Sequence, residues 1–436
     1  KEMKVERVKE DKDKVIIVTT GAKYIVDKSG KTGKISSYQL LNKERLLATI
    51  NFNYSFSTLS VEKKDDSTCV LHQEVGGGGA YLRLQINSDS LLDIYSCKEL
   101  NLSFSGNFLS DYRAEKNGNI LLIDEMGGIG IYPYKGLKNI ELINLNSKEW
   151  KIKCTLDNWS RILVSVFPPR KFNYTQSFAE RVTHHSSWTE PYPSDRMIEA
   201  AGKYTNVLVL HSMIWQGKYI RKGKMLKTRE DSYSDASFCC FDYLPVSEKE
   251  LIRVVKKAHS LKMKIIPYMS PFYSMAKGKD FLDRVEDVLR KYEMDGVYFD
   301  GISSDILYSY QMIQDTRKLL KDKILYVHCT SDPLMSSNIY CPFIDTYADY
   351  ILRAEHIKSF SNEYLRYVLS GYNISNAIGY ICYYDYPLEF IKKLIDRVLS
   401  VNARFYLGLP IGEREKLLMN NYFPKLENKD KLRRKR

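Results

Sequence analysis

The sequence predicts a two-domain α/β protein, with an antiparallel β-sandwich followed by a (β/α)8 barrel. Two observations lead to this prediction. Short strands separated by turns fill the first part of the chain, and strand-like runs alternate with amphipathic helices in the rest. The pattern changes at Pro168-Pro169. We therefore expect the sandwich over residues 15–170, the barrel over 176–420 and a basic tail over 421–436.

The composition is typical of a folded protein with a sizeable core. The 436 residues are 44% hydrophobic and 27% charged, and the length exceeds that of one ordinary domain. The formal net charge of +13 comes partly from the tail, and the other basic residues are scattered among acids. No basic stripe with interleaved aromatic residues occurs, so we expect no nucleic-acid partner. No apolar run has the length of a membrane span. The oligomeric state stays open.

The eight cysteines show no Cys-x-x-Cys spacing of the kind found in zinc sites. Several lie in apolar strand-like runs, as free buried cysteines do. This pattern favours a reducing compartment and hence a cytoplasmic location. Secretion stays open, because the chain begins with Lys1 and no true N-terminus is defined.

Short strands separated by turn signals predict the sandwich. The first fourteen residues are mostly charged, so we expect a frayed lead-in before it. The glycine run at 76–79 is interpreted as a hairpin loop, because no Lys-Ser/Thr pair follows it as in a phosphate-binding loop. Clear strand-like runs lie at residues 15–19, 81–86, 120–123, 140–145 and 161–167.

Beyond the proline pair, the alternation of strands and helices is typical of βαβ units around a parallel sheet. Eight strands in this region fit a (β/α)8 barrel. Residues 218–242 show little periodicity, and we expect a long loop there. The strands are expected at 181–186, 206–211, 264–268, 296–299, 324–328, 350–353, 377–382 and 404–409. The clearest helices are expected at 248–260, 279–292, 308–320, 362–369 and 388–401.

Two carboxylates follow strands at the end where such barrels carry their active sites. Asp300 ends the fourth strand, in the motif Asp-Gly-Val-Tyr-Phe-Asp-Gly of residues 295–301, and Glu355 follows the sixth strand. Paired carboxylates match glycoside hydrolysis, in which one attacks or stabilises the anomeric carbon and the other protonates the leaving oxygen. Their closeness to the strand ends favours the shorter separation, which gives retention. Asp305 and Asp332 stay open as alternative acids.

Two other aspartates precede their strands instead of following them. Asp295 lies before the fourth strand and Asp349 before the sixth. They should lie on the opposite face of the barrel, where residues serve stability. We interpret both as structural.

Aromatic and histidine side chains also collect after the strands. Trp188, Trp215 and Tyr268 are expected to be stacking platforms, since aromatic faces suit flat polyhydroxylated rings. His211 and His328 are expected to bind ring hydroxyl groups. The expected substrate-binding residues are His211, Trp215, Tyr268, Trp188, His328 and Arg353.

The histidines also allow a metal-site interpretation. His184, His185, His211 and His328 would have to converge with Asp300, as in metal-dependent barrel hydrolases. No His-x-His pair follows the first strand, and the adjacent His184 and His185 should point to opposite faces. We therefore expect no metal ligands and no cofactor, and the metal-dependent hydrolase stays an alternative.

The region from about residue 181 to 409 resembles the (β/α)8 glycoside hydrolases of the α-galactosidase and endo-α-N-acetylgalactosaminidase group. The segments that carry the resemblance are Lys264-Ile-Ile-Pro-Tyr268, the motif of residues 295–301, and Tyr347-Ala-Asp-Tyr-Ile-Leu-Arg-Ala-Glu355. Those enzymes often carry a β-sandwich before the barrel, which matches the first part of this chain.

The resemblance implies a retaining mechanism with a nucleophile on the fourth strand and an acid/base on the fifth or sixth. Carried over to this sequence, it makes Asp300 the nucleophile and Glu355 the acid/base. Ala354 stands where a glycine is expected before that glutamate.

The sequence thus predicts a glycosidase that acts on an O-glycosidic bond of a carbohydrate substrate. Gly-x-Ser-x-Gly, Walker and Rossmann glycine patterns do not occur, which argues against esterases, NTPases and dehydrogenases. The alternative from another class is a catalytically inactive glycan-binding or scaffold protein that keeps the barrel. The sequence does not specify the sugar, the linkage or endo versus exo action.

Overall fold

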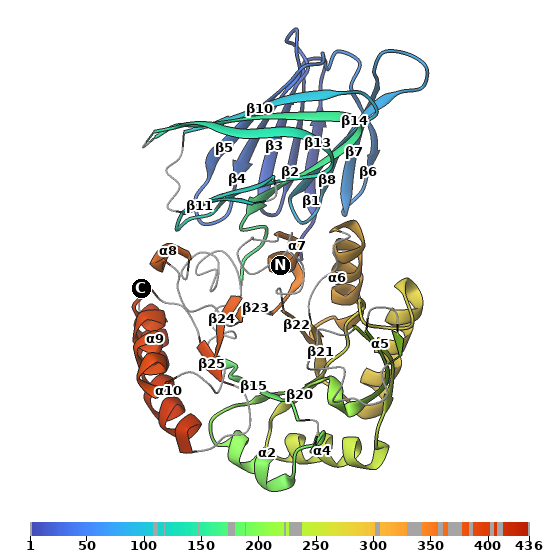
Figure 1. The fold of residues 1–436 in the computed structure, drawn as a ribbon. Coiled ribbons are helices and arrows are strands. Elements are labelled where there is room, and N and C mark those ends of the chain that lie inside the picture. Colours follow the sequence, from blue (N-terminus) through green and yellow to red (C-terminus); the bar gives the residue numbers. More distant parts are fainter. Residues whose placement is uncertain are drawn as a thin grey trace. The chain divides into compact units, whose positions relative to one another are not determined.

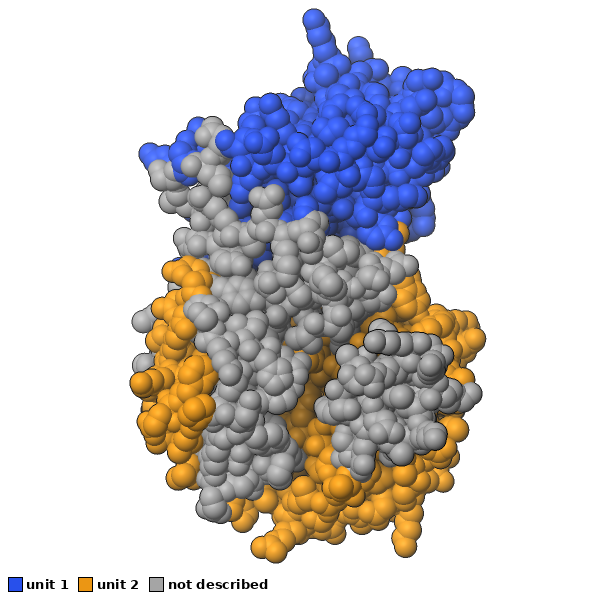
Figure 2. All heavy atoms as spheres, in the orientation of Figure 1, with its two compact units in different colours: residues 1–172, 339–342, 373–375 blue, residues 173–338, 343–372, 376–436 orange. Residues whose placement is uncertain are grey.

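The computed structural model divides the chain into two compact units (Figure 2). Unit 1 comprises residues 1–172, 339–342 and 373–375, and unit 2 comprises 173–338, 343–372 and 376–436. The structure describes residues 2–107, 112–116, 118–146, 148–172, 179–187, 189–221, 224–225, 238–300, 306–328, 342–355, 361–364, 377–382, 387–401, 405–407 and 413–434.

Unit 1 is built around one large antiparallel sheet of fourteen strands (Figure 1). The main path runs β1-β2-β3-β4-β5-β10-β14-β9-β8-β7-β6, and β13, β12 and β11 extend from β14 in that order. The strands are β1 (Val5–Glu10), β2 (Lys14–Thr19), β3 (Ala22–Asp27), β4 (Lys34–Gln39), β5 (Arg45–Phe52), β6 (Ser60–Lys64), β7 (Thr68–Glu74), β8 (Tyr81–Asn87), β9 (Leu91–Ser96), β10 (Leu100–Gly106), β11 (Tyr112–Lys116), β12 (Asn119–Ile123), β13 (Gly128–Leu145) and β14 (Trp150–Phe167).

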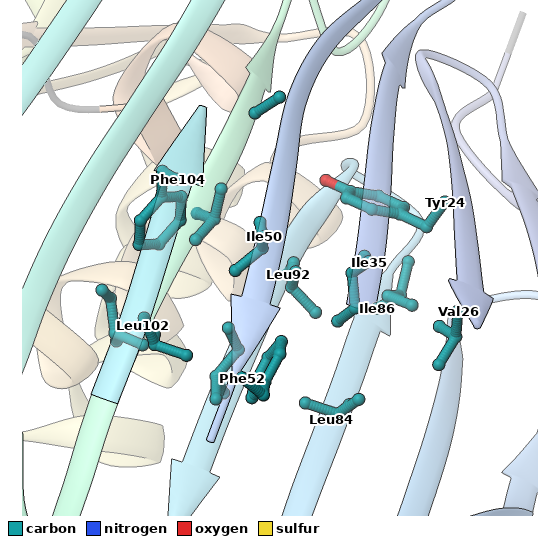
Figure 3. Packing of buried hydrophobic residues seen from close by; sticks show 14 of the residues in the cluster. Tyr24, Val26, Ile35, Ile50, Phe52, Leu84, Ile86, Leu92, Leu102 and Phe104 are labelled. Atoms are coloured by element: carbon teal, nitrogen blue, oxygen red, sulfur yellow. The ribbon is translucent and has the colours of Figure 1, made fainter. Parts of the chain in front are cut away.

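Two arms of this sheet, one from β1 to β5 and the other from β9 to β6, share one hydrophobic core (Figure 3). Ile35 and Ile50 come from one arm, Leu84 and Leu92 come from the other, and all four are fully buried. Alternate residues of a strand point to one face, so the alternating apolar pattern of each arm supplies one side of the core. Tyr24 is buried in the same core, and its hydroxyl donates to the carbonyl oxygen of Ser90 at 2.5 Å.

The expectation of a frayed lead-in before residue 15 is wrong. Residues Val5–Glu10 form β1, which pairs antiparallel with β2, and Val5 is buried. β1 lies at one end of the sheet path, and β6, which is also rich in charged residues, lies at the other end. Charged side chains protect exposed sheet edges from pairing with other chains, so the charge that suggested a lead-in suits an edge strand.

The five strand-like runs predicted for this region are confirmed within β2, β8, β12, β13 and β14. β13 and β14 are each continuous over 18 residues, which is longer than the runs the pattern predicts. Their pairing contains register shifts, and each shift breaks the alternation that marks a strand in the sequence.

Three cysteines of unit 1 are free and buried, as their apolar surroundings predict. They are Cys69, Cys97 and Cys154. Burial raises the pKa of the Cys69 thiol to about 11 and that of the Cys154 thiol to about 12. Both thiols therefore stay protonated at neutral pH and behave as small apolar side chains.

The described residues of unit 2 form eight parallel strands in two sheets, at the positions predicted from the sequence. The first sheet has the order β15 (Val182–His185), β16 (Val207–Leu210) and β20 (Lys264–Pro267). The second has the order β21 (Gly296–Asp300), β22 (Ile324–His328), β23 (Tyr350–Glu355), β24 (Ala377–Cys382) and β25 (Phe405–Leu407). A parallel bridge between Tyr268 and Tyr298 joins the two sheets, and residues of β25 and β15 approach within 8 Å between Cα atoms.

Helices follow the strands of unit 2 along the chain, and Figure 1 shows them around the centrally placed strands. In α4, Ser247 caps the N-terminus by accepting from the amide of Glu250, and Leu251, Val254 and Ala258 form a buried stripe at helical spacing. Among the described helices, none combines the length and apolarity needed to cross a membrane. The helices are α2 (Asp195–Gly202), α4 (Glu248–Ser260), α5 (Gly278–Tyr292), α6 (Ile306–Leu320), α7 (Pro342–Tyr347), α8 (Asn362–Tyr364), α9 (Leu388–Ser400) and α10 (Glu413–Arg434).

One region of unit 2 differs from expectation. The predicted loop at 218–242 contains strand structure, because β17 (Trp215–Arg221) pairs antiparallel with β18 (Lys224–Met225) and with β19 (Phe238–Pro245). A register shift near Gly217 and the mixed polar composition hide this pairing in the sequence. The C-terminal segment from 421 continues α10 as far as Arg434.

The aspartates that precede strands have structural partners. Asp295 lies just before β21, and its Oδ2 accepts from the backbone amide of Ile265 at 2.8 Å and from His259 Nε2 at 2.9 Å. Asp349 lies just before β23, and its Oδ2 accepts from the amide of Leu325 at 2.8 Å. Each carboxylate thus binds the beginning of a neighbouring strand, as expected for a stabilising role.

Replacing Asp295 with alanine is expected to destabilise unit 2 by about 1–3 kcal/mol, because the buried amide of Ile265 loses an acceptor. Urea unfolding followed by far-UV circular dichroism, which reports the helices of unit 2, measures the change. The control Asp287→Ala removes an exposed surface partner of Arg290 and should change stability by less than about 0.5 kcal/mol. Equal unfolding midpoints for the two variants would contradict the assignment.

Candidate active site

Asp300 is the last residue of β21, and the parallel register places it beside His328, the last residue of β22. The preceding residues Val297, Tyr298 and Phe299 are buried, which fixes the strand in the unit. The side chain of Asp300 keeps 30% of its surface exposed. A rigid strand thus presents a partly accessible carboxylate at its carboxyl end.

The two oxygens of Asp300 have different neighbours. Oδ1 lies 3.1 Å from His328 Nδ1 and accepts from the hydroxyl of Tyr298 at 3.4 Å. Oδ2 lies 3.8 Å from His211 Nε2, beyond hydrogen-bond range. His211 directly follows β16, and its Nδ1 lies 3.1 Å from Ser212 Oγ. Three of the eight parallel strands therefore contribute to the surroundings of one carboxylate.

Aromatic rings pack next to this carboxylate. The ring of Tyr298 lies 4.8 Å from that of Tyr326 and 4.9 Å from that of His184, between centroids. His184 Nε2 lies 3.0 Å from the hydroxyl of Tyr326. All three side chains are buried, so they restrict the orientation of Tyr298 and its hydroxyl.

The carboxyl group of Asp300 has a lowered pKa in spite of its burial. Burial by itself would raise the pKa of the carboxyl group, but the hydrogen bond with His328 and the nearby imidazoles of His211 and His184 lower it below the ordinary value. Asp300 is therefore ionised at neutral pH. An ionised carboxylate with an accessible oxygen can act as a nucleophile or stabilise a positive charge.

Two histidines near Asp300 have pKa values that are shifted in favour of the neutral imidazole. Burial lowers the pKa of His211 and lowers that of His184 well below its ordinary value. Both imidazoles are therefore neutral at neutral pH. A neutral imidazole has one donor and one acceptor nitrogen, which suits the recognition of hydroxyl groups.

Two predicted stacking residues are buried. Trp215 is 0% exposed and Tyr268 is 3% exposed. The indole Nε1 of Trp215 donates to the carbonyl oxygen of Tyr268 at 2.6 Å, and the indole packs edge-on against Tyr243 at 5.7 Å. A sugar ring needs an accessible aromatic face, so this burial argues against the stacking role expected for Trp215 and Tyr268. The ring of Tyr268 lies 5.1 Å from that of His211 and helps to position it.

The other expected residues are placed less completely. Glu355 ends β23, three residues beyond Leu352, which is in register with His328. Arg353 belongs to the same strand. Trp188 and the alternative acids, Asp305 and Asp332, lie outside the described residues.

The sequence analysis did not identify Tyr298 and Tyr326 as parts of the site. Tyr298 is two residues before Asp300, and Tyr326 is two residues before His328. Residues two apart in a strand share a face, so the period of the strand is the signal that leads from each polar residue to its tyrosine.

The adjacent histidines His184 and His185 point in different directions. His184 contacts Tyr326, whereas His185 Nε2 lies 2.7 Å from the carbonyl oxygen of Glu190, as predicted for neighbours in a strand. Within the described ranges, no group of three or more His, Cys, Asp or Glu side chains is arranged to hold a metal ion.

Comparison with known proteins gives structural likeness without sequence matches. No protein family and no curated protein matches the sequence. An uncharacterized protein from Listeria monocytogenes EGD-e is 10% identical with a TM-score of 0.44, covering 97% of this chain and 54% of that chain. The chain therefore spans about half the length of that protein.

Glycoside hydrolases are among the similar structures. The glucosidase II alpha subunit is 8% identical with a TM-score of 0.45, covering 97% of this chain and 68% of that chain. A GH31 dextranase from Flavobacterium johnsoniae is 9% identical with a TM-score of 0.41, covering 98% of this chain and 68% of that chain. These TM-scores are below 0.5, and likeness at this level does not indicate an activity for this chain.

Stability of unit 2 is expected to fall as the pH drops below about 6.5. In that range an unfolded histidine binds a proton, whereas His184 and His211, whose pKa values are lowered in the folded state, bind protons only at lower pH. Each adds up to about 1.4 kcal/mol per pH unit to the slope, and this contribution to stability is complete above the unfolded pKa.

Urea unfolding at about pH 7.5 and about pH 5.5, followed by circular dichroism, measures this dependence. The variant His184→Gln cannot titrate, so its stability should change less between the two conditions. A wild-type free energy of unfolding that is equal at both pH values would contradict the assignment of neutral buried histidines.

Proposed function

We propose that the chain is a glycoside hydrolase that cleaves an O-glycosidic bond with retention of anomeric configuration. Asp300 is the nucleophile and Glu355 is the acid/base in this proposal. The observation that supports it most is the ionised, partly exposed carboxylate of Asp300 at the carboxyl end of β21. The motif of residues 295–301, which resembles the α-galactosidase-like group, supports an α-linked substrate.

The proposed scaffold is a closed (β/α)8 barrel over residues 176–420, with a β-sandwich over 15–170 before it. The bridge between Tyr268 and Tyr298 supports continuity of the two parallel sheets, and the approach of β25 to β15 supports closure. In such a barrel the carboxyl ends of the strands surround one site.

In the first proposed step, a lone pair of Asp300 forms a bond to the anomeric carbon. The glycosidic C–O bond breaks, its electron pair goes to the leaving oxygen, and Glu355 gives that oxygen a proton. In the second step, a water oxygen bonds to the anomeric carbon and a proton of that water goes to Glu355. The bond to Asp300 breaks and its electron pair returns to the carboxylate, so the net reaction consumes one water.

Glu355 is proposed as the partner of Asp300 because both residues lie at the carboxyl ends of parallel strands of one sheet. β23 is two strands from β21, and Glu355 is three residues beyond Leu352, the residue in register with His328. Two strand spacings of about 4.8 Å and three rises of about 3.3 Å give a backbone separation on the order of 14 Å. The directions of the two side chains then decide whether the carboxyl groups reach the separation of about 5–5.5 Å that retention requires. Asp305 and Asp332 stay the alternatives for the acid/base.

Replacing Asp300 with asparagine is expected to lower turnover by about 10³-fold or more while the protein stays folded, because the nucleophile is lost. Hydrolysis of a panel of aryl α- and β-glycosides measures turnover. The control Asp287→Asn changes an exposed aspartate of α5 and should keep full activity. Wild-type activity in the Asp300 variant would refute the assignment of Asp300 as the nucleophile. Glycan binding by the wild type without hydrolysis of any panel member would favour the inactive glycan-binding protein.

Replacing Glu355 with glutamine is expected to slow cleavage most for substrates with poor leaving groups, because these need a proton from the acid. Aryl glycosides with acidic phenols should lose much less than natural glycosides. Asp305→Asn and Asp332→Asn, assayed on the same substrates, identify the acid/base. If Asp305→Asn or Asp332→Asn shows the leaving-group dependence and Glu355→Gln does not, the acid/base is the aspartate replaced in that variant.

A further inference from the structure

The hydrogen bonds around Asp300 distinguish its two oxygens. Oδ1 is bound by His328 and by Tyr298. Among the described residues no hydrogen bond reaches Oδ2, and His211 Nε2 lies 3.8 Å from this oxygen. On the basis of the proposed function, we infer that His328 and Tyr298 are positioning residues that hold Oδ1, and that Oδ2 is the atom that attacks the anomeric carbon.

The positions of the protons follow from the chemistry of the groups. An ionised carboxylate accepts hydrogen bonds and donates none. The proton between His328 and Asp300 therefore lies on His328 Nδ1, and the hydroxyl of Tyr298 donates to the same oxygen. The Tyr298 hydroxyl also lies 3.1 Å from His328 Nδ1. The three polar atoms form a closed triangle in which each side chain restrains the other two.

Packing restricts the rotation of the Tyr298 and His328 side chains. Tyr298 is 2% exposed, and its ring is enclosed by Tyr326 and His184. The side chain of His328 is 6% exposed, and its ring is nearly parallel to that of Tyr298 at an interplanar angle of 21°. Asp300, in contrast, keeps 30% of its side-chain surface exposed. The donors are fixed and the acceptor is accessible, which is the arrangement required to orient a nucleophile.

The same hydrogen bonds serve both proposed steps. During attack they stop the carboxylate from rotating, so that Oδ2 faces the substrate. When water releases the sugar, negative charge returns to the carboxylate, and a hydrogen bond to an ionised acceptor is stronger than one to an ester oxygen. His328 and Tyr298 therefore make Asp300 a better leaving group. Neither residue touches the reacting carbon in this arrangement, and His328 is assigned to Asp300 instead of to a sugar hydroxyl.

The first test titrates Asp300 without using activity. Carbon-13 NMR of carboxyl-labelled aspartate, with the Asp300 signal assigned from Asp300→Asn, gives its pKa in each variant. His328→Ala removes a donor, so the pKa of Asp300 should rise by about one unit or more. Tyr298→Phe should raise it by less, because its hydrogen bond is longer. His328→Asn keeps an amide donor close to the position of Nδ1 and should restore most of the shift.

The second test uses the pH dependence of kcat/KM, whose acid limb reports the free enzyme. The limb should move to higher pH in His328→Ala by the same amount as the NMR titration, and kcat should fall more than KM changes. Loss of structure alone would reduce the amount of active protein without moving the limb.

Two matched controls come from the same unit. His259→Asn alters a histidine bonded to an aspartate at 2.9 Å, at the other end of β21. Tyr292→Phe removes a tyrosine hydroxyl bonded to the carboxylate of Glu248 at 3.0 Å. Both should leave the titration of Asp300 and the acid limb unchanged.

The inference and the proposed function fail in different ways. An unchanged Asp300 titration in both His328→Ala and Tyr298→Phe would overturn the inference, whether or not the protein hydrolyses glycosides. Full turnover by Asp300→Asn would overturn the proposed function, and with it the attack by Oδ2. A titration shift that Asn restores, together with a shifted acid limb, supports the inference.

Discussion

The parallel pairing of β21 with β22 is the constraint on which the candidate site depends. It places Asp300 in register with His328 at the carboxyl ends of the two strands, and it aligns Tyr298 with Tyr326 one pleat earlier. A slip of one residue would turn these side chains to the opposite face of the sheet. The register is held by buried apolar residues such as Val297 and Val327, so the packing of the strands and the geometry of the carboxylate are set together.

Unit 2 uses the same pair of residue types for two purposes. At one end of β21, Asp295 bonds to His259 and to the amide of Ile265, which uses the carboxylate to join two strands. At the other end, Asp300 bonds to His328 through Oδ1 and keeps Oδ2 without a hydrogen bond within the described part of the chain. A carboxylate whose oxygens serve the backbone stabilises the fold, and one that keeps an accessible oxygen is available for chemistry.

The strands of unit 2 could be predicted because most of them are short apolar runs, and amphipathic helices such as α4 and α5 lie between several of them along the chain. β1 was missed because an edge strand carries the charges that also mark a disordered terminus. Asp300 followed from its place at a strand end, but its partners depend on neighbouring strands that are distant in sequence. Burial of Trp215 could not be predicted, because it results from packing against Tyr243, which lies on the far side of the segment 218–242 whose pattern suggested a loop.

In the proposed mechanism, Asp300 forms a covalent bond to the sugar. The most direct measurement is peptide mass mapping after incubation with fluorinated glycosyl fluorides, which form the glycosyl–enzyme ester quickly and release it slowly. We expect one accepted reagent to add a single sugar mass to the peptide that contains Asp300. An adduct on another carboxylate, or turnover of a glycoside with no adduct from the corresponding reagent, would contradict the account.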